Sequence, residues 1–330
     1  MKFSLRFNND LPTRDYTALA QAAEAAGFDQ FWVSDDLFLR SAPVILTACA
    51  AATRRIELGT CIVNPYTLHP AEMAMMAATL DEISGGRFNL GISAGAAEFL
   101  KWVGITPVKP MRLVAETITA LRKLFAGERA EFQGELLRWT DEAFLRFTPT
   151  RKIPIYIGAL SPQMLKLTGM VADGGLPLLL PPEHYETVQP LIAQGAKEAG
   201  RQLEELDLAA CIWVSVAKDR RAAEMALRQK IAYYGHALSP LIWDRLGVTQ
   251  ADFQPIERAA MSDNDLPRAA QMVTPEMLKI GVVGSPQDII KRLEPLVAQG
   301  VRHLSFGPPL GADPLEAIEV LGRDVLPYFK

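Results

Sequence analysis

The sequence predicts a single α/β domain folded as a (β/α)8 TIM barrel, with insertions at the C-terminal face of the sheet. Apolar strand-like runs alternate with longer helix-period segments, which is the signature of βα units on a parallel sheet. Eight such runs can be counted along the 330 residues. A chain of this length that is 49% apolar can bury two ordinary cores or one barrel-sized core, and no linker marks a boundary between domains.

The predicted strands are rich in Val, Ile, Leu and Phe and follow one another along the whole chain. Segments such as YTALAQAAEAAG and PAEMAMMAATLDEISGG lie between them and end in glycine, as helices commonly do. A doubly wound open sheet is the alternative, but it leaves the seventh and eighth strands without an ordinary place. The strands cover residues 2–7, 30–35, 56–62, 87–93, 153–158, 175–180, 207–216 and 301–307.

Two segments are longer than a connection between a strand and a helix requires. The first, about 127–150, contains GERAEFQGELLRW, whose alternating polarity around a glycine predicts a β-hairpin. The second, about 235–285, combines YGHALSPLIWDRLG with a polar SDNDLP loop and the stretch TPEMLKIGVVGSP. Long insertions in barrels usually cover the site at the C-terminal face. We therefore expect residues 1–330 to form one domain with both insertions at that face.

The composition favours a small-molecule partner. The net charge is −4, the pI is near 5.7, and Lys and Arg are scattered singly, so no basic patch is predicted for nucleic acid or an anionic membrane. The N-terminus enters a strand pattern directly, and no apolar run approaches the ~20 residues of a membrane span, so we expect a cytoplasmic protein. The three cysteines are far apart and the four histidines lack metal-ligand spacing, so we predict neither a disulfide nor a metal site.

Candidate functional residues follow from the fold, because a barrel of this type carries its site at the C-terminal ends of the strands. Any one of them alone can be an ordinary capping or loop residue; Asp35 or Asp36, for example, can cap the next turn. Their joint placement is what indicates a site. The candidates are Arg6, Asp35, Asp36 and the segments 61–64, 93–95 and 158–163.

The segment IYIGALSPQMLKLTG indicates an anion site after the fifth strand. The strand runs through Gly158 to Ser161, and Pro162 stands at the first position of a helix. Backbone N–H groups at the start of a helix, its dipole and the Ser161 hydroxyl can hold a phosphate without a cationic side chain. A plain N-cap by Ser161 is the alternative. The turn SAGAAEFL supports a site nearby, because small residues permit the close approach of a planar ligand.

Four segments resemble a known family and together run through most of the chain. They are AEAAGFDQFWVSDD, RIELGTCIVNPYTLHPAEMAMMAATLDEISGGRFNLGIS, KIPIYIGALSPQMLKLTGMVADG and VVGSPQDIIKRLEPLVAQGVRHLSFGPPLG. They resemble the bacterial luciferase-like superfamily of flavin and deazaflavin enzymes, and within it the methylenetetrahydromethanopterin reductases that use coenzyme F420. No dinucleotide-binding, Walker A, zinc-protease or hydrolase motif suggests another class.

The resemblance implies a barrel with coenzyme F420, or alternatively FMN, across its mouth, and hydride transfer between the ring and a small organic substrate. It also implies a non-prolyl cis peptide at Cys61–Ile62 that backs the ring, whereas a simple β-bulge is the alternative. Asn64-Pro65 then keeps the chain out of a helix until Pro70 begins one. By position, the implied cofactor-binding residues are Asp35, Asp36, Cys61, Ile62, Asn64, Ala94, Gly95, Gly158, Ala159, Leu160, Ser161, Gln163 and Met164.

Two positions depart from the family pattern. Relatives often have His at the position of Asp36, and the reductases have an acidic residue, proposed as proton donor, at the position of Arg6. An arginine stays cationic at neutral pH and cannot act as a carboxylic acid, which puts the pterin reaction in doubt. We therefore hypothesise that Asp36 is the catalytic acid or base, with a pKa raised by partial desolvation, and that Arg6 contacts an anionic group of the substrate or cofactor.

An F420-dependent oxidoreductase is the leading functional hypothesis. An FMN-dependent monooxygenase of the same fold is the second, and a non-catalytic flavin- or deazaflavin-binding protein, which would explain the missing His and Glu, is the third. The resemblance also implies a homodimer or larger assembly through apolar helix faces such as residues 71–80, although a Met-rich face is more often part of a core.

Overall fold

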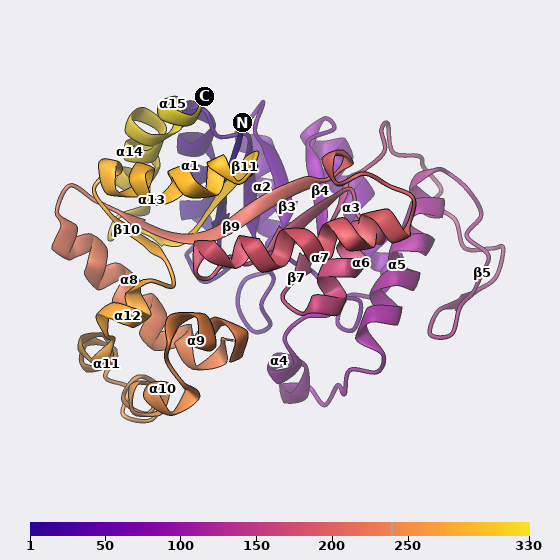
Figure 1. Cartoon of the computed structure of the whole chain (residues 1–330). Coiled ribbons are helices and arrows are strands. Elements are labelled where there is room, and N and C mark those ends of the chain that lie inside the picture. The colour runs from indigo at the N-terminus through magenta and orange to yellow at the C-terminus, as the bar shows by residue number, and fades with distance from the viewer. Residues whose placement is uncertain (239) are drawn as a thin grey trace.

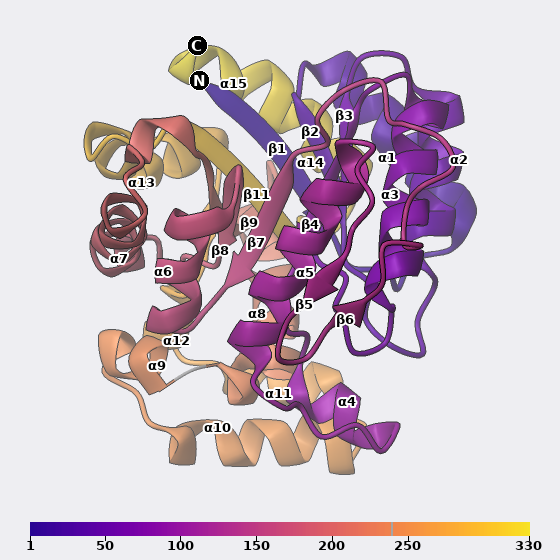
Figure 2. The same ribbon diagram turned by 90° about the vertical axis from the view of Figure 1, so that its right-hand side faces the viewer.

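The computed structural model describes residues 1–238 and 240–330, which form a closed barrel of eight parallel strands surrounded by helices (Figure 2). The barrel prediction is confirmed. The open-sheet alternative is wrong, because β8 pairs with β9 and β11 pairs with β1, which closes the ring. In their order around the barrel the strands are β1 (Lys2–Phe7), β2 (Gln30–Val33), β3 (Glu57–Thr60), β4 (Phe88–Ile92), β7 (Ile155–Ala159), β8 (Gly174–Pro177), β9 (Asp207–Val216) and β11 (His303–Leu310).

One further strand, β10 (Val282–Gly284), is missing from the sequence prediction, which placed these residues in the second insertion. It runs parallel to the last three residues of β9, with Val282 opposite Val214, while β8 pairs with the beginning of β9. Three residues are too few to show a strand periodicity, and this is why the pattern did not reveal β10.

The outer helices begin and end at the signals that the sequence contains. Pro70 and Pro162 are the first residues of their helices, and Gly27 and Gly85 follow the last residues of two helices in the left-handed conformation, with φ of 84° and 69°. The helices outside the second insertion are α1 (Thr13–Ala26), α2 (Ala42–Ala52), α3 (Pro70–Ser84), α4 (Ala97–Trp102), α5 (Pro110–Phe125), α6 (Pro162–Val171), α7 (Tyr185–Glu198), α8 (Arg220–Tyr234), α13 (Pro286–Ala298), α14 (Pro314–Val320) and α15 (Leu326–Phe329).

The predicted hairpin is confirmed, because β5 (Phe132–Gln133) and β6 (Arg138–Trp139) pair as antiparallel strands. It lies against the outside of α5, where the Glu116 carboxylate accepts the backbone N–H groups of residues 135–137 at 2.8 to 2.9 Å. Burial alone would raise the pKa of Glu116, but these hydrogen bonds outweigh it and lower the pKa to about 2. The first insertion thus packs against the flank of the barrel. We had expected it to cover the C-terminal ends of the strands.

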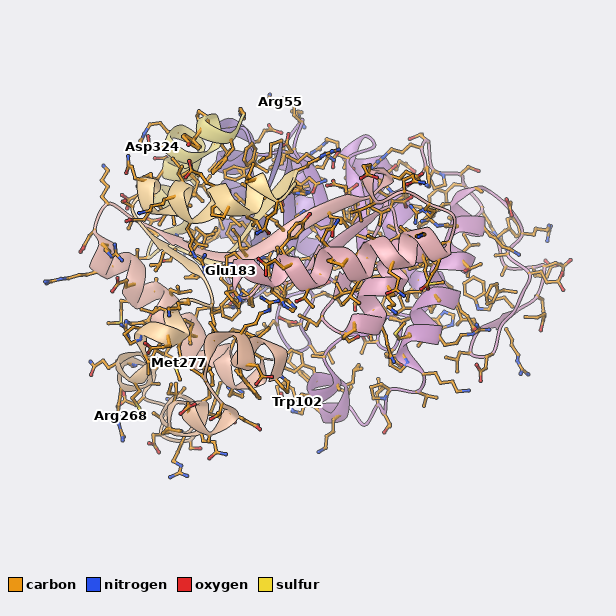
Figure 3. All side chains as sticks on the ribbon, viewed as in Figure 1. Arg55, Trp102, Glu183, Arg268, Met277 and Asp324 are labelled. Carbon is orange, nitrogen blue, oxygen red and sulfur yellow. The ribbon has the colours of Figure 1, made fainter. Side chains whose placement is uncertain are left out.

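The second insertion forms a helical layer at the end of the barrel opposite the chain termini (Figure 1). Trp213 of β9 and Leu227 of α8 belong to the apolar core of this layer. Figure 3 labels Met277 of the layer and Trp102 of α4 at this same end. The helices are α9 (Pro240–Leu246), α10 (Gln250–Glu257), α11 (Leu266–Met272) and α12 (Pro275–Leu278), and Ser239 of the insertion lies outside the described residues.

The N-terminal ends of the strands carry a polar network that we call the floor, formed by Lys2, Ser4, Tyr156, Asp207 and His303. The His303 ring lies between the Ser4 hydroxyl and the Asp207 carboxylate, 2.8 Å from each. Tyr156 and Lys2 donate to the other oxygen of that carboxylate, both at 2.8 Å. Burial alone would raise the pKa of Asp207, but His303 and Lys2 outweigh it and hold the pKa well below its usual range.

Within the described residues, no helix is both long enough and apolar enough to cross a bilayer, and no group of three His, Cys, Asp or Glu side chains is arranged to hold a metal ion. On α3, Met73 and Leu80 are buried in the core, whereas Met75 and Ile83 are exposed. The Met-rich face therefore contributes mainly to the core, and subunit association stays a prediction.

Candidate active site

A cavity of about 500 Å³ opens at the C-terminal ends of the barrel strands. Pockets for small molecules and cofactors typically measure about 300–1,000 Å³. All the predicted site residues line this cavity except Gln163, which is exposed on α6 beside them. The lining residues are Arg6, Asp35, Asp36, Leu37, Cys61, Ile62, Asn64, Ser93, Ala94, Gly95, Ala96, Phe99, Leu100, Gly158, Ala159, Leu160, Ser161, Met164, Leu176, Leu178 and Cys211.

The two consecutive carboxylates after β2 have different environments. Asp35 accepts the backbone N–H of Ala42 at 2.9 Å, so its carboxylate caps the start of α2. The Asp36 carboxylate accepts the Ser34 hydroxyl at 3.3 Å, while the side chain of Asn9 holds the Asp36 main chain. Burial raises the pKa of Asp36, and the Ser34 hydrogen bond offsets this only in part. Burial raises the pKa of Asp35 as well, so what distinguishes the two carboxylates is that Asp35 caps a helix and Asp36 does not.

Arg6 enters the cavity from the end of β1. Its Nε donates to the Ser305 hydroxyl at 3.1 Å, and its Nη2 donates to the Ile212 carbonyl at 3.0 Å. Gly307 makes room for this side chain, because a Cβ at that position would collide with Nη2. Two of the five guanidinium N–H donors are used in these bonds, which orient a permanent positive charge at the cavity.

The third strand ends at the expected cis peptide, because the bond between Cys61 and Ile62 is cis and non-prolyl. The structure thus agrees with the family resemblance and not with a simple β-bulge. The Asn64 side-chain oxygen then accepts the backbone N–H groups of Tyr66 and Thr67, both at 3.1 Å. This turn leads the chain from the strand to α3, which is why the sequence there suits neither element.

One wall of the cavity is built from small residues. A Cβ on Gly158 would stand 2.9 Å from Ile62 Cγ2, and one on Gly95, whose φ is 76°, would stand 3.1 to 3.2 Å from the Asn64 side chain. Ser93 donates to the Gly158 carbonyl at 2.7 Å and fixes the wall. The two glycines keep side chains out of this space, so the wall suits a flat ligand.

The turn between β7 and α6 suits an oxyanion. The Ser161 Oγ accepts the backbone N–H of Met164 at 3.2 Å, so the predicted N-cap is present. A serine hydroxyl that accepts one hydrogen bond can still donate its own proton. The first turn of the ten-residue helix adds N–H groups and the positive end of the helix dipole. These donors match a phosphate without the help of a cationic side chain.

Sequence reasoning missed Lys230 of α8, a cation whose charge interacts with those of Asp36 and Arg6. Its Nζ lies 3.7 Å from the centroid of the Tyr234 ring and 5.3 Å from that of Trp213. The run RRAAEMALRQK shows only a helix period, and it does not mark the residue that faces the barrel. The spacing of Lys230 and Tyr234, four residues apart on a helix, is the signal that could have suggested their contact.

Aromatic side chains form a rim beside α4. The ring centroids of Phe99 and Trp102 are 4.8 Å apart, and the Phe38 ring lies 6.2 Å from that of Trp102. Phe38 is 72% exposed and has a φ of 65°, which a bulky residue rarely adopts. Because Phe99 also lines the cavity, the rim extends its apolar surface toward solvent.

These features define a class of protein: a parallel barrel whose mouth combines an apolar cavity, a flat wall, an oxyanion turn and a partly desolvated carboxylate, as suits a phosphorylated planar redox molecule. The comparison with known families agrees. The family of luciferase-like monooxygenases matches residues 5–303, and the chain belongs to this family. The superfamily predicted from the sequence is confirmed.

Known relatives match nearly the whole chain. A 5,10-methylenetetrahydromethanopterin reductase of Archaeoglobus fulgidus is 34% identical, and the match covers 100% of both chains. An F420-dependent glucose-6-phosphate dehydrogenase of Nakamurella multipartita is 32% identical over 94% of this chain and 91% of its own. The structure of the coenzyme F420-dependent tetrahydromethanopterin reductase of Methanopyrus kandleri superimposes with a TM-score of 0.94 at 30% identity, covering 100% of this chain and 99% of that one.

Proposed function

We propose that the protein is a coenzyme F420-dependent oxidoreductase that transfers a hydride between the deazaflavin and a small organic substrate. Full-length similarity to F420-dependent enzymes supports this proposal. The structural observation that carries it is that Asp36, a partly desolvated carboxylate, lines the same cavity as the oxyanion turn at Ser161. One cavity thus offers a place for a phosphorylated cofactor and a group that can move a proton.

The residues at the cavity fit this cofactor. The Ser161 hydroxyl and the N–H groups that begin α6 would hold its phosphate, and the wall of Gly95 and Gly158, backed by Ile62, would accept its ring. When bound, the deazaflavin supplies or accepts the hydride. The protein orients the ring, excludes water with its apolar lining and holds a proton at the Asp36 carboxylate.

Asp36 is the proposed proton donor or acceptor. Reduction of a C=N or C=O bond consumes one proton together with the hydride, and the reverse oxidation releases one. A carboxyl group whose pKa is raised by burial can carry that proton at near-neutral pH. Arg6 stays charged and would bind an anionic group, so a pterin reaction in this protein would have to use Asp36 as its acid.

Cofactor binding is the direct test of this proposal. Purified protein is titrated with F420 and, separately, with FMN, and each Kd is measured from the change in cofactor fluorescence. We expect F420 to bind more tightly than FMN. We also expect the reduced or the oxidised form of F420 to exchange a hydride with at least one substrate from a panel of methylene-pterins, sugar phosphates and secondary alcohols. Tighter binding of FMN with oxygen consumption would favour the monooxygenase. Binding without turnover across the panel would favour the non-catalytic alternative.

We further propose that residues 1–330 act as one domain and that the protein forms a homodimer or larger assembly. The packing of the second insertion on β9 and α8 supports a single unit. The exposed Met75 and Ile83 on α3 are compatible with a subunit contact, beside the buried part of the same helix. Light scattering coupled to size-exclusion chromatography measures the assembly, and a mass of 36.3 kDa at all concentrations would contradict it.

A further inference from the structure

Arg6 is a buried cation that lines the cavity without a counter-charge from the protein. The residue is only 8% exposed. Both of its hydrogen-bond acceptors, the Ser305 hydroxyl and the Ile212 carbonyl, are neutral. Among the described residues, no carboxylate forms an ion pair with Arg6, and this includes Asp36, which lines the same cavity. A buried charge costs free energy unless an opposite charge and hydrogen bonds compensate it.

Two thiols in the cavity do not supply the missing negative charge. Cys61 and Cys211 line the cavity together with Arg6. Burial raises the pKa of both thiols, that of Cys61 to about 12, and it outweighs the opposite effect of the guanidinium. Both thiols are therefore neutral near pH 7. A negative charge that matches Arg6 has to come from a ligand.

The guanidinium is held in place but keeps donors for such a ligand. Ser305 and Ile212 fix Nε and Nη2, and the missing side chain at Gly307 gives Nη2 its space. Both N–H groups of Nη1 and the second N–H of Nη2 have no acceptor among the described residues. Donors in one rigid plane match the two oxygens of a carboxylate, which can accept from Arg in a bidentate way.

Arg6 lies across the barrel from the oxyanion turn. In the closed ring, β7 is the fourth strand from β1 in either direction. The turn at Ser161 follows β7, so a ligand that places its phosphate there has that phosphate on the side opposite Arg6. Asp36 follows β2, the direct neighbour of β1. Arg6 and Asp36 thus border the part of the cavity that faces the turn and the flat wall, where a second molecule can bind.

We propose that Arg6 determines substrate specificity by binding a carboxylate, so that the substrate is a small organic acid whose reducible bond lies next to that carboxylate. This inference rests on the proposed function. In the reducing direction, the substrate carbon gains a hydride with its electron pair from the cofactor, and the neighbouring heteroatom gains the proton of Asp36. The carboxylate stays unchanged, and Asp36 regains a proton from water. Binding at Arg6 orients the acid for both transfers.

Ligand binding without turnover tests this assignment. Isothermal titration calorimetry measures the Kd of acetate, pyruvate and benzoate, each beside its neutral amide, in the protein with and without oxidised F420. We expect at least one acid to bind about tenfold more tightly than its amide, because its hydrogen bonds to Arg6 are charge-assisted. Arg6→Met should abolish this preference, whereas Arg55→Met, which alters an exposed arginine at the end that carries the termini (Figure 3), should keep it. A panel without any preference for the acids, or a preference that survives Arg6→Met, would overturn the inference. Tighter binding of methyl phosphate than of every acid would overturn it in favour of a phosphate ester.

Thermal unfolding separates a binding role of Arg6 from a structural one. Without ligand, Arg6→Met should unfold at the same midpoint as the parent or a higher one, because it removes an unpaired buried charge. The acid that binds most tightly should raise the midpoint of the parent and not that of Arg6→Met. Arg6→Lys, which keeps the charge but loses the planar fork, gives an independent test if Arg6→Met does not fold, and its affinity for the acid should fall severalfold. A lower midpoint combined with unchanged acid binding in either variant would show a merely structural role.

These experiments separate the failure of this inference from that of the proposed function. If F420 does not bind but the acids bind through Arg6, the carboxylate site exists and the cofactor assignment fails. If F420 binds and supports turnover of neutral substrates only, the proposed function stands and the acid substrate is rejected. If F420 excludes the acids and Arg6→Met weakens F420 binding, the cation serves the cofactor and the inference is rejected as well.

Discussion

The two ends of the barrel contain similar side chains but differ in how completely those side chains are paired. At the floor, His303 lies 2.8 Å from both Ser4 and Asp207, and that carboxylate also accepts Tyr156 and Lys2. Serine, histidine and aspartate stand there in the order of a hydrolase triad. None of them lines the cavity, however, so this trio lies outside the candidate site.

At the mouth, the polar groups are fewer and less completely paired. The Asp36 carboxylate has a single long hydrogen bond, to Ser34, and Arg6 uses two of its five donors. Both side chains line a cavity that is otherwise mostly apolar, and their remaining hydrogen-bonding positions are free for a ligand. The comparison teaches that residue type does not identify an active site in this fold. What identifies it is a set of buried polar groups whose hydrogen-bonding positions the protein does not fill. A ligand can then fill these positions.

The largest expected effect is at the mouth. Asp36→Asn removes the proposed proton carrier but keeps the size of the side chain, so kcat/KM with F420 should fall about 10²–10⁴-fold while the thermal midpoint changes little. Steady-state kinetics and circular dichroism measure the two quantities. Asp324→Asn, at the end of the molecule that carries the termini (Figure 3), is the matched control and should retain full activity. Full turnover by Asp36→Asn with bound cofactor would remove this residue from the mechanism.

At the floor we expect a loss of stability with no change in cofactor binding. Asp207→Asn leaves Lys2 and His303 without their carboxylate. Because the Lys2 side chain is 48% exposed and that of Asp207 19% exposed, solvent screens part of this network, and we expect a loss of at most about 3 kcal/mol of unfolding free energy. Urea unfolding measures this loss, and the Kd for F420 below the unfolding transition should not change. A variant that is as stable as the parent but binds F420 weakly would reverse the roles assigned to the two ends.

The floor also predicts a pH dependence. The pKa of Asp207 is lower in the folded protein than its unfolded value of about 3.9, so its contribution to stability is fully present above that pH. This contribution is lost as the pH falls through the lower, folded pKa. The difference in unfolding free energy between the parent and Asp207→Asn should therefore be constant at neutral pH and shrink in acid. A difference that stays constant down to pH of about 2 would contradict the assignment.

A smaller effect is expected at Gly307, which makes room for the Arg6 side chain. Gly307→Ala places a methyl group against Nη2 and should destabilise the fold by about 1–3 kcal/mol, with a rise in KM for an anionic substrate. In a background of Arg6→Ala, the same substitution should have almost no further effect on KM, because the side chain it displaces is gone. Strictly additive effects of the two substitutions would show that Gly307 does not act through Arg6.

The smallest effect is expected at the oxyanion turn. Ser161→Ala removes an N-cap, which costs about 1 kcal/mol, and removes the proposed donor to the cofactor phosphate, which should weaken F420 binding about tenfold. Ser285→Ala removes the similar N-cap of α13, whose serine does not line the cavity, and should cost stability alone. Equal F420 affinity in both variants would mean that Ser161 is only a helix cap.

The sequence predicted the barrel well because buried parallel strands show as continuous apolar runs. Residues 2–7 and 207–216 match β1 and β9 without error, whereas β10 is too short to be recognised from its own residues. Most residues that line the cavity could be located by position, since family resemblance and strand ends indicate the same turns.

Two features of the site depended on three-dimensional packing. Asp35 and Asp36 are adjacent and chemically alike, and only the hydrogen bond to Ala42 shows which one is the cap. Lys230 lies almost 200 residues further along the chain than these carboxylates, on a helix whose period is compatible with any orientation toward the barrel. Its position is set by the packing of α8 against β9, which no local pattern encodes.

The pairing of β10 with the end of β9 has a consequence for how this protein could be re-engineered. Val216 lies opposite Gly284, and the Ala217 N–H donates to the Gly284 carbonyl at 3.4 Å, so the chain departs from the barrel and rejoins it at a single point. The segment from Ala217 to Gly284 therefore has its two ends side by side, so it can be exchanged as one unit. Grafting the corresponding stretch of a relative onto this scaffold exchanges α8 and the helical layer of the second insertion without displacing a strand of the eight-stranded barrel or the turn at Ser161.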